Sequence, residues 1–159
     1  MRRFLLFLGL VAMLAVPAIV TAASLTDGTL SVKRGRATIN IKLQRGTVIG
    51  RMASGTIRIR DLGPYDNSIP QIRHCRLRYP NSTTIACTGK KIVFRAVDGR
   101  FVVRLKGSGI FLSAVGRGTV TITGAANPTS TNGVMSVDNG PYQQIPDFEM
   151  TFTLGSTTP

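Results

Sequence analysis

The sequence repeats with a period of nine residues over two long stretches. Residues 28–60 divide into GTLSVKRGR, ATINIKLQR, GTVIGRMAS and GTIRIR, and residues 91–123 divide into KIVFRAVDG, RFVVRLKGS, GIFLSAVGR and GTVTIT. Each unit holds about six alternating or apolar residues and then a glycine-containing segment, which is typical of a short strand and a tight turn. No segment beyond the N-terminal apolar run shows a sustained helical period. The repeat therefore predicts an all-β protein.

Short strands joined by tight turns form antiparallel meanders that close into a sandwich or a barrel. With further strands near 134–137 and 148–154, we expect an antiparallel β-sandwich, or a flattened barrel, of about eleven or twelve strands. A β-solenoid is the alternative, because stacked coils also produce a fixed period. Nine residues are too few for one coil, and a reversal at Asp98-Gly99 favours the sandwich.

Asp98-Gly99 lies between two apolar runs, which is a strong signal for a two-residue hairpin turn. A turn there sets one strand against the next and places alternate residues on one face. The expected inward pairs are Ala96 with Phe101, Phe94 with Val103, and Ile92 with Leu105. The opposite face carries Lys91 with Lys106, Val93 with Arg104, and Arg95 with Val102. This hairpin predicts one core face and one cationic face.

The two cysteines predict a second hairpin. A turn at Pro80-Asn81-Ser82 sets Leu77 opposite Ile85 and Cys75 opposite Cys87. Directly opposed residues lie within the range that a disulfide spans. Closing a loop of this size stabilises the fold by about 3 kcal/mol in the chain-entropy view. We expect a structural Cys75–Cys87 disulfide rather than free thiols or a metal site.

The N-terminus has the order of a secretory signal peptide: a basic start, an apolar run from Phe4 to Val20, and small residues at 21–23. We expect residues 1–23 to be removed and residues 24–159 to form a single all-β domain outside the cytoplasm, secreted or in the cell envelope. An uncleaved membrane anchor is the alternative. Loss of Arg2 and Arg3 lowers the net charge from +13 to +11.

Two similar loops indicate a degenerate internal duplication. Residues 63–70 read GPYDNSIP and residues 140–146 read GPYQQIP. We interpret the chain as two β-meander halves, each closed by a Pro-Tyr loop. Tyr65 and Tyr142 are candidate ligand-contact residues, because loops on a rigid scaffold often carry recognition. The alternative is that each ring caps an open end of the core, with its hydroxyl bonded to a backbone group.

Few residues of this chain are suited to catalysis. His74 is the single histidine, it lies among arginines, and no acid is near it in sequence. Most of the seven carboxylates adjoin Gly, Asn or Pro, where Asp is ordinary turn chemistry. No hydrolase, zinc-protease or phosphate-loop motif is present. We expect no catalytic residue, cofactor or metal, and keep an unrecognised hydrolase as the third functional alternative.

The basic residues carry the main functional expectation. They would cluster if the central strands are neighbours, and a strongly basic domain attracts polyanions. The candidate contacts are Arg58, Arg60, Arg73, Arg76, Arg78, Lys90, Lys91, Arg95, Arg104 and Lys106. We expect contact with anionic polysaccharide or wall polymer. Specific nucleic-acid recognition is not indicated, because no Trp and no RNA-binding motif is present. The alternatives are a self-assembling surface module and charge that only keeps the protein soluble.

Overall fold

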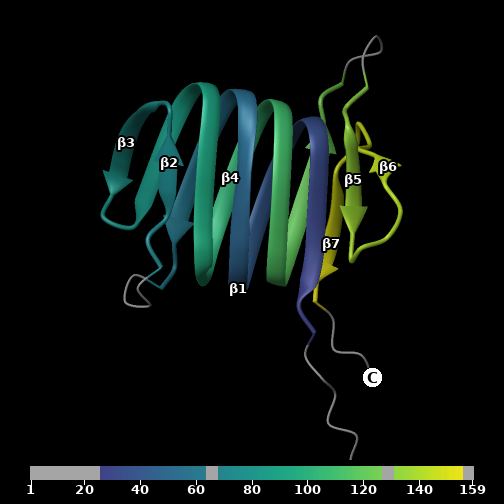
Figure 1. Cartoon of the computed structure of the whole chain (residues 1–159), viewed down its shortest axis with the longest axis horizontal. Coiled ribbons are helices and arrows are strands. Elements are labelled where there is room, and N and C mark those ends of the chain that lie inside the picture. Colours follow the sequence, from purple (N-terminus) through teal and green to yellow (C-terminus); the bar gives the residue numbers. More distant parts are fainter. Residues whose placement is uncertain (1–25, 64–67, 127–130, 156–159) are drawn as a thin grey trace, which may run out of the picture.

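The computed structural model describes residues 26–63, 68–126 and 131–155. These residues form an antiparallel all-β fold with no helix, as expected. Two strands are very long and the other five are short (Figure 1). The strands are β1 (Gly28–Asp61), β2 (Gln71–Arg73), β3 (Arg76–Asn81), β4 (Thr84–Gly124), β5 (Val134–Val137), β6 (Gln143–Gln144) and β7 (Met150–Leu154).

The long strands β1 and β4 wind around each other as an antiparallel ribbon. Val48 of β1 pairs with Ala96 on one side and with Ala114 on the other, eighteen positions further along β4. The same double pairing recurs along β1, so each turn of one strand lies between two turns of the other (Figure 1). One turn of the coil therefore takes two nine-residue units, and the period in the sequence corresponds to half a turn.

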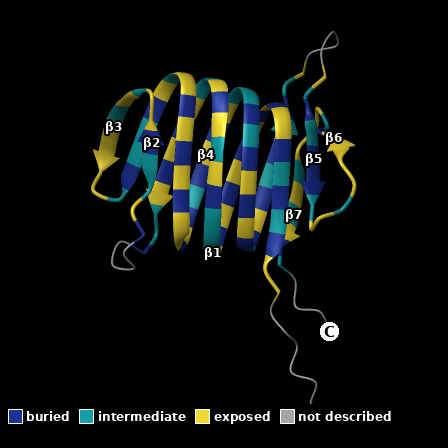
Figure 2. Ribbon diagram, viewed as in Figure 1, coloured by how far each residue is buried: buried dark blue, intermediate teal, exposed yellow. Residues whose placement is uncertain are grey.

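The coil is flattened into two sheets that enclose one core. The first sheet contains residues 38–43 and 56–60 of β1, residues 84–88, 101–106 and 118–123 of β4, and strands β3 and β7. The second sheet contains residues 28–32 and 47–52 of β1, residues 92–96 and 110–115 of β4, and strands β2 and β5. Buried and exposed residues alternate along both long strands (Figure 2). Consecutive nine-residue units therefore belong to opposite sheets.

Glycines make the corners between the two sheets. Glycines of neighbouring turns face one another in two columns: Gly28, Gly116, Gly46 and Gly99, and Gly89, Gly55 and Gly107. At Gly46 φ is +154°, and a Cβ would overlap the carbonyl oxygen of Val115. At Gly55, where φ is +148°, a Cβ would likewise overlap the carbonyl oxygen of Lys106. The absence of a side chain therefore lets the backbones approach closely and lets a strand bend without losing its neighbours.

The expectation of a hairpin at Asp98-Gly99 is wrong. Strand β4 continues through this dipeptide, with Asp98 at φ +51°, and Phe94 pairs with Gly50 rather than with Val103. The positive φ that suits a hairpin turn also suits a corner, and here β1 supplies hydrogen-bond partners on both sides of the bend. The expected inward residues are all buried: Ile92, Phe94, Ala96, Phe101, Val103 and Leu105. Alternation is thus preserved although the chain does not reverse.

The strand count also differs from the sequence-based expectation, because the glycine segments bend strands instead of ending them. Seven strands are found in the described residues rather than eleven or twelve. The fold is sandwich-like in its two packed sheets and its single core, and it shares a coiled path with the alternative solenoid. The strand order β2-β4-β1-β5-β6 is open, so the sheet does not close into a barrel.

Short strands extend the sheets at both ends of the coil (Figure 1). Near the start of β1, the chain adds β5 beside β1 and β7 beside β4, at the expected 134–137 and within the expected 148–154. At the other end, β2 and β3 both pair with β4. Because β1 and β4 are interleaved along their length, the expected pair of separate meander halves is not found.

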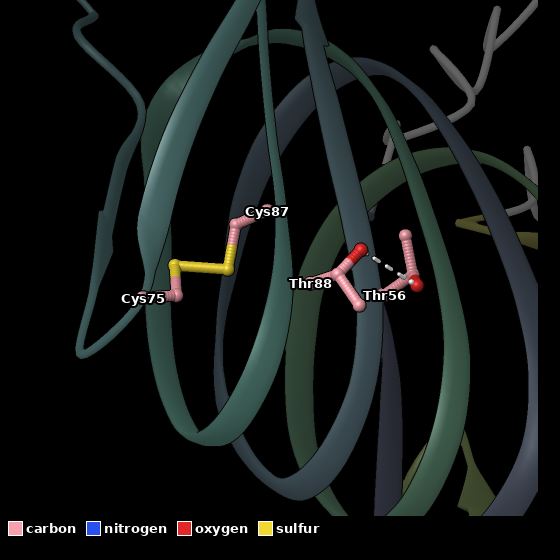
Figure 3. Close-up of a disulfide and its surroundings, with 4 residues drawn as sticks. All are labelled: Thr56, Cys75, Cys87 and Thr88. Atoms are coloured by element: carbon pink, nitrogen blue, oxygen red, sulfur yellow. Dashed lines mark hydrogen bonds between the residues drawn. A yellow bond between two sulfur atoms is a disulfide. The ribbon is translucent and has the colours of Figure 1, made fainter.

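The expected disulfide is confirmed at the β3 end. Cys75 and Cys87 are bonded, with their Cα atoms 6.1 Å apart (Figure 3). The hairpin is also present, but Leu77 rather than Cys75 lies opposite Cys87, so the register is shifted by two residues. The reason is the turn: Asn81 Oδ1 accepts hydrogen bonds from the backbone N–H and the hydroxyl of Thr83. Asn81 therefore begins the turn instead of occupying its middle.

Candidate functional site

The two outer surfaces of the coil differ because their outward residues come from alternate units of the repeat. We call the outer side of the first sheet the arginine face. Its outward basic residues are Lys42, Arg58, Arg60, Arg76, Arg78, Arg104 and Lys106. We call the outer side of the second sheet the apolar face. Its exposed or half-buried apolar residues are Ile49, Val93, Val97, Phe111 and Val115.

On the arginine face, Arg58 and Arg104 are direct cross-strand partners. Side chains in such a pair lie about 5 Å apart at their Cβ atoms, and like charges there are destabilising. Arg60 follows Arg58 on the same side of β1, and Lys106 follows Arg104 on the same side of β4. Arg78 of β3 lies one strand beyond Arg58, separated from it by Ala86. The positive charge is therefore spread over four adjacent strand segments, three of which carry basic side chains.

Three of these arginines line a hollow of about 210 Å³, a size suited to a small anionic group. Its lining residues are Arg58, Arg60, Pro80, Asn81, Thr84, Val102 and Arg104. They include no acid, and the ion pairs Arg45–Asp98 and Arg117–Asp27 lie at glycine corners instead. Among the described residues, no carboxylate forms a salt bridge with an arginine of this hollow. The site thus presents guanidinium groups with their hydrogen-bond donors available to an anion.

The structure divides the basic residues that the sequence had grouped together. Six of them share the arginine face: Arg58, Arg60, Arg76, Arg78, Arg104 and Lys106. Arg95 and Arg73 belong instead to the second sheet, where they pair with Gln71 and Val93. Lys90 and Lys91 are at the glycine corner between the sheets. The reason is the half-turn of nine residues, which carries 91–97 and 100–106 to opposite sides.

Lys42 is a member of the arginine face that sequence reasoning missed. It pairs with Val102 on one side and with Thr119 on the other, in the row that continues to Arg60. Its position eighteen residues before Arg60 was the available signal, since residues one full turn apart share a face. The repeat contains this spacing, but an expectation of separate short strands does not place residues 42 and 60 on one face.

Tyr142 lies at the margin of the apolar face. Its ring is half-exposed, its hydroxyl shares a 2.9 Å hydrogen bond with Ser31 Oγ, and Lys33 Nζ is 4.0 Å from the ring centroid. The hydrogen bond with Ser31, and then Lys33, lower the pKa of Tyr142 below its usual value. The hydroxyl is thus bonded to a side chain, not to the backbone group expected for a cap. Tyr65 lies outside the described residues.

His74 and the carboxylates do not assemble into a recognisable catalytic group in the part of the chain that the structure describes. His74 is exposed and borders a cleft with Arg51 and Lys91. A second cleft, of about 640 Å³ at the β2–β3 end, has Asp61 as the single acid among its described lining residues. Across residues 26–63, 68–126 and 131–155, no three His, Cys, Asp or Glu residues gather where they could hold a metal ion.

Two further findings bear on location and relationship. No helix among the described residues is long and apolar enough to cross a membrane, and the disulfide is compatible with an oxidising, extracytoplasmic compartment. Comparison of the chain with protein families, curated proteins and solved structures gives no match. The two faces are therefore the features from which a function is inferred.

Proposed function

We propose that this is an exported, non-catalytic envelope or extracellular protein that contacts anionic polymers through its arginine face. The observation that carries the proposal is the direct opposition of Arg58 and Arg104 beside Arg60, around a hollow without acids. Such a cluster lowers stability in the free protein, and a bound sulfate, phosphate or carboxylate would relieve the repulsion. The ligand class is an anionic polysaccharide or a wall polymer with repeating charges.

The regular sheet favours a repeating ligand over a single small anion. Outward residues recur about every 7 Å along a strand, and strands are about 4.8 Å apart. Arg76 and Arg78 extend the charge to β3, beyond the hollow itself. A polymer can therefore place successive charges on successive positions. Such binding is screened by salt.

The arrangement of β3 favours polymer contact over self-assembly as the use of this surface. In the described residues β3 pairs with β4 alone, so one of its edges is open. That edge strand carries Arg76, Arg78 and Pro80, which are residues that oppose edge-to-edge pairing. Copies that approach by this edge would repel each other.

The test is retention on immobilised heparin and on a glycerol-phosphate polymer, over a range of salt concentrations. We expect the double variant Arg58→Gln/Arg104→Gln to lose about tenfold in affinity, and the slope of log affinity against log salt to fall by about two. The matched control is Arg73→Gln/Arg95→Gln, which removes the same charge from the other sheet and should lose much less. Equal losses in the two variants would reduce the effect to net charge and refute the proposed face.

A further inference from the structure

The apolar face is the second surface of the coil, and its side chains differ in chemistry from those of the arginine face. Ile49, Val93, Val97 and Val115 are each at least 42% exposed, although they lie within regular strands of a sheet. Several arginines alternate with them across the strands. One row runs from Arg73 through Val93 and Arg51 to Phe111, and the next runs from Gln71 through Arg95 and Ile49 to Ser113.

A cleft of about 420 Å³ opens at one side of this face, and its walls are mostly apolar. Val93, Phe111 and Ala53 line it, with buried Met52 and Ile92 beneath. Its rim is basic, with Arg51, Lys91 and His74 among the lining residues. The Arg51 guanidinium lies 4.7 Å from the centroid of the Phe111 ring, so its charge is held directly beside the apolar wall.

The backbone around the cleft is held in an uncommon conformation. His74, Lys91 and Gly109 all have positive φ, at 64°, 54° and 60°. A positive φ is uncommon for residues other than glycine, and such residues often concentrate at binding sites. Two non-glycine residues with positive φ, His74 and Lys91, therefore lie at this one cleft, and both belong to its basic rim.

We propose that the apolar face docks onto a lipid bilayer that contains anionic lipid. Anionic headgroups would complement the positive charge of this face. Residues 47–51, 71–73, 91–97 and 111–115 contain four basic side chains and no carboxylate. In each row an arginine stands beside an apolar side chain, as a headgroup layer above an acyl layer requires. Phosphate groups would bind Arg51, Arg95 and Lys91, while Val93, Ile49 and Phe111 enter the apolar boundary.

The proposal is independent of polymer binding, because it uses the other sheet. An acidic protein partner fits less well, since the exposed Val and Ile side chains are spread over several strands and are not gathered into the central anchor that interfaces use. A second copy of this chain is also disfavoured, because it would set the same arginines against one another. Both occupants are outcomes that the experiment separates.

The experiment is binding of residues 24–159, the chain expected after removal of the signal peptide, to vesicles made of phosphatidylglycerol and phosphatidylcholine in equal parts. A spin label on a fraction of the headgroups broadens the amide signals of residues that contact the bilayer. We expect broadening in residues 47–51, 91–97 and 111–115, and little in residues 56–60 and 102–106. The reverse pattern would mean that the arginine face binds the vesicle by charge alone, and it would overturn the proposal.

Variants test the same point by affinity. Val93→Thr/Phe111→Thr keeps residues that suit a strand, and it should lower vesicle affinity about tenfold while heparin retention is unchanged. Val102→Thr, on the arginine face, is the matched control and should bind as the parent does. Unchanged vesicle binding in the double variant would overturn the proposal. So would a stable dimer that the same two substitutions dissociate.

Discussion

The two faces of this coil are built from one repeat, yet they expose different chemistry. Outward residues of the first sheet are mainly Thr, Arg and Lys, and those of the second include Ile49, Val93, Val97 and Val115. Both sheets cover the same core, which contains aliphatic residues from every turn. Because one turn takes eighteen residues and the repeat has nine, alternate units of the repeat supply the outward residues of alternate sheets. The two surfaces are therefore specified by different residues. Alternate units are free to diverge outward because their inward residues alone determine packing.

The largest effect is expected at the corners that keep the two faces apart. Gly46→Ala would set a Cβ against the Val115 carbonyl at a positive φ, and we expect it to lower the free energy of unfolding by about 4 kcal/mol. Urea denaturation measures this loss. Gly89→Ala is the control, because a Cβ there first meets Cys75 Cβ at 3.4 Å. Equal stability of the two variants would contradict the corner role of Gly46.

Loss of the disulfide should weaken binding by the arginine face and leave binding by the apolar face intact. Cys75→Ala/Cys87→Ala is expected to lower the free energy of unfolding by about 3 kcal/mol. It should also weaken heparin retention, because Arg76 and Arg78 lie on β3, the strand that follows Cys75. Vesicle binding through the other sheet should persist. A variant that loses both activities equally while still folded would show that the faces are coupled.

A smaller effect concerns the repulsion between Arg58 and Arg104. Replacing Arg58 with Thr should raise the free energy of unfolding by about 0.5 kcal/mol at low salt, and the gain should disappear at high salt. Arg95→Thr is the control, because the cross-strand neighbours of Arg95 are Gln71 and Ile49. Thermal unfolding at two salt concentrations resolves the difference. A salt-independent gain would point to strand propensity instead of charge.

The smallest effect is at Tyr142. Its pKa is lowered by the Ser31 hydrogen bond and by Lys33, so Ser31→Ala and Lys33→Gln should each raise the pKa. The ionised form is favoured in the folded protein. Its contribution to stability is therefore fully present above the unfolded-state pKa, and it is lost as the pH falls through the lowered folded-state value. Tyrosinate absorbance, with Tyr142→Phe subtracted, measures both shifts; unchanged titration would rule out these contacts.

The sequence was sufficient to predict what depends on alternation alone. Phe94 and Val103 were expected to be inward, and both are buried, because the period of two is the same in a straight strand and in one that bends at a corner. The disulfide was predictable for a similar reason, since Cys75 and Cys87 remain close in either register of the hairpin.

The path of the chain was not predictable from the same signals. Asp98-Gly99 has the composition of a reversal, and only the pairing of β4 with β1 on both sides makes it a bend. That pairing joins residues far apart in sequence, such as Gly28 with Gly116, which no local pattern reports. The candidate site was affected directly, because Arg95 and Arg104 were assigned to one face and lie on two.

The interleaving of β1 with β4 also limits how a chain of this kind can change in length. An insertion of nine residues in one strand would transfer every later unit to the opposite side, so threonines and arginines would exchange places with valines. Insertion of a full turn in both strands would instead lengthen the molecule and keep each surface intact. Such a coil can grow only by matched additions to both long strands. A relative should therefore differ in length from this chain by whole turns that are added to both strands.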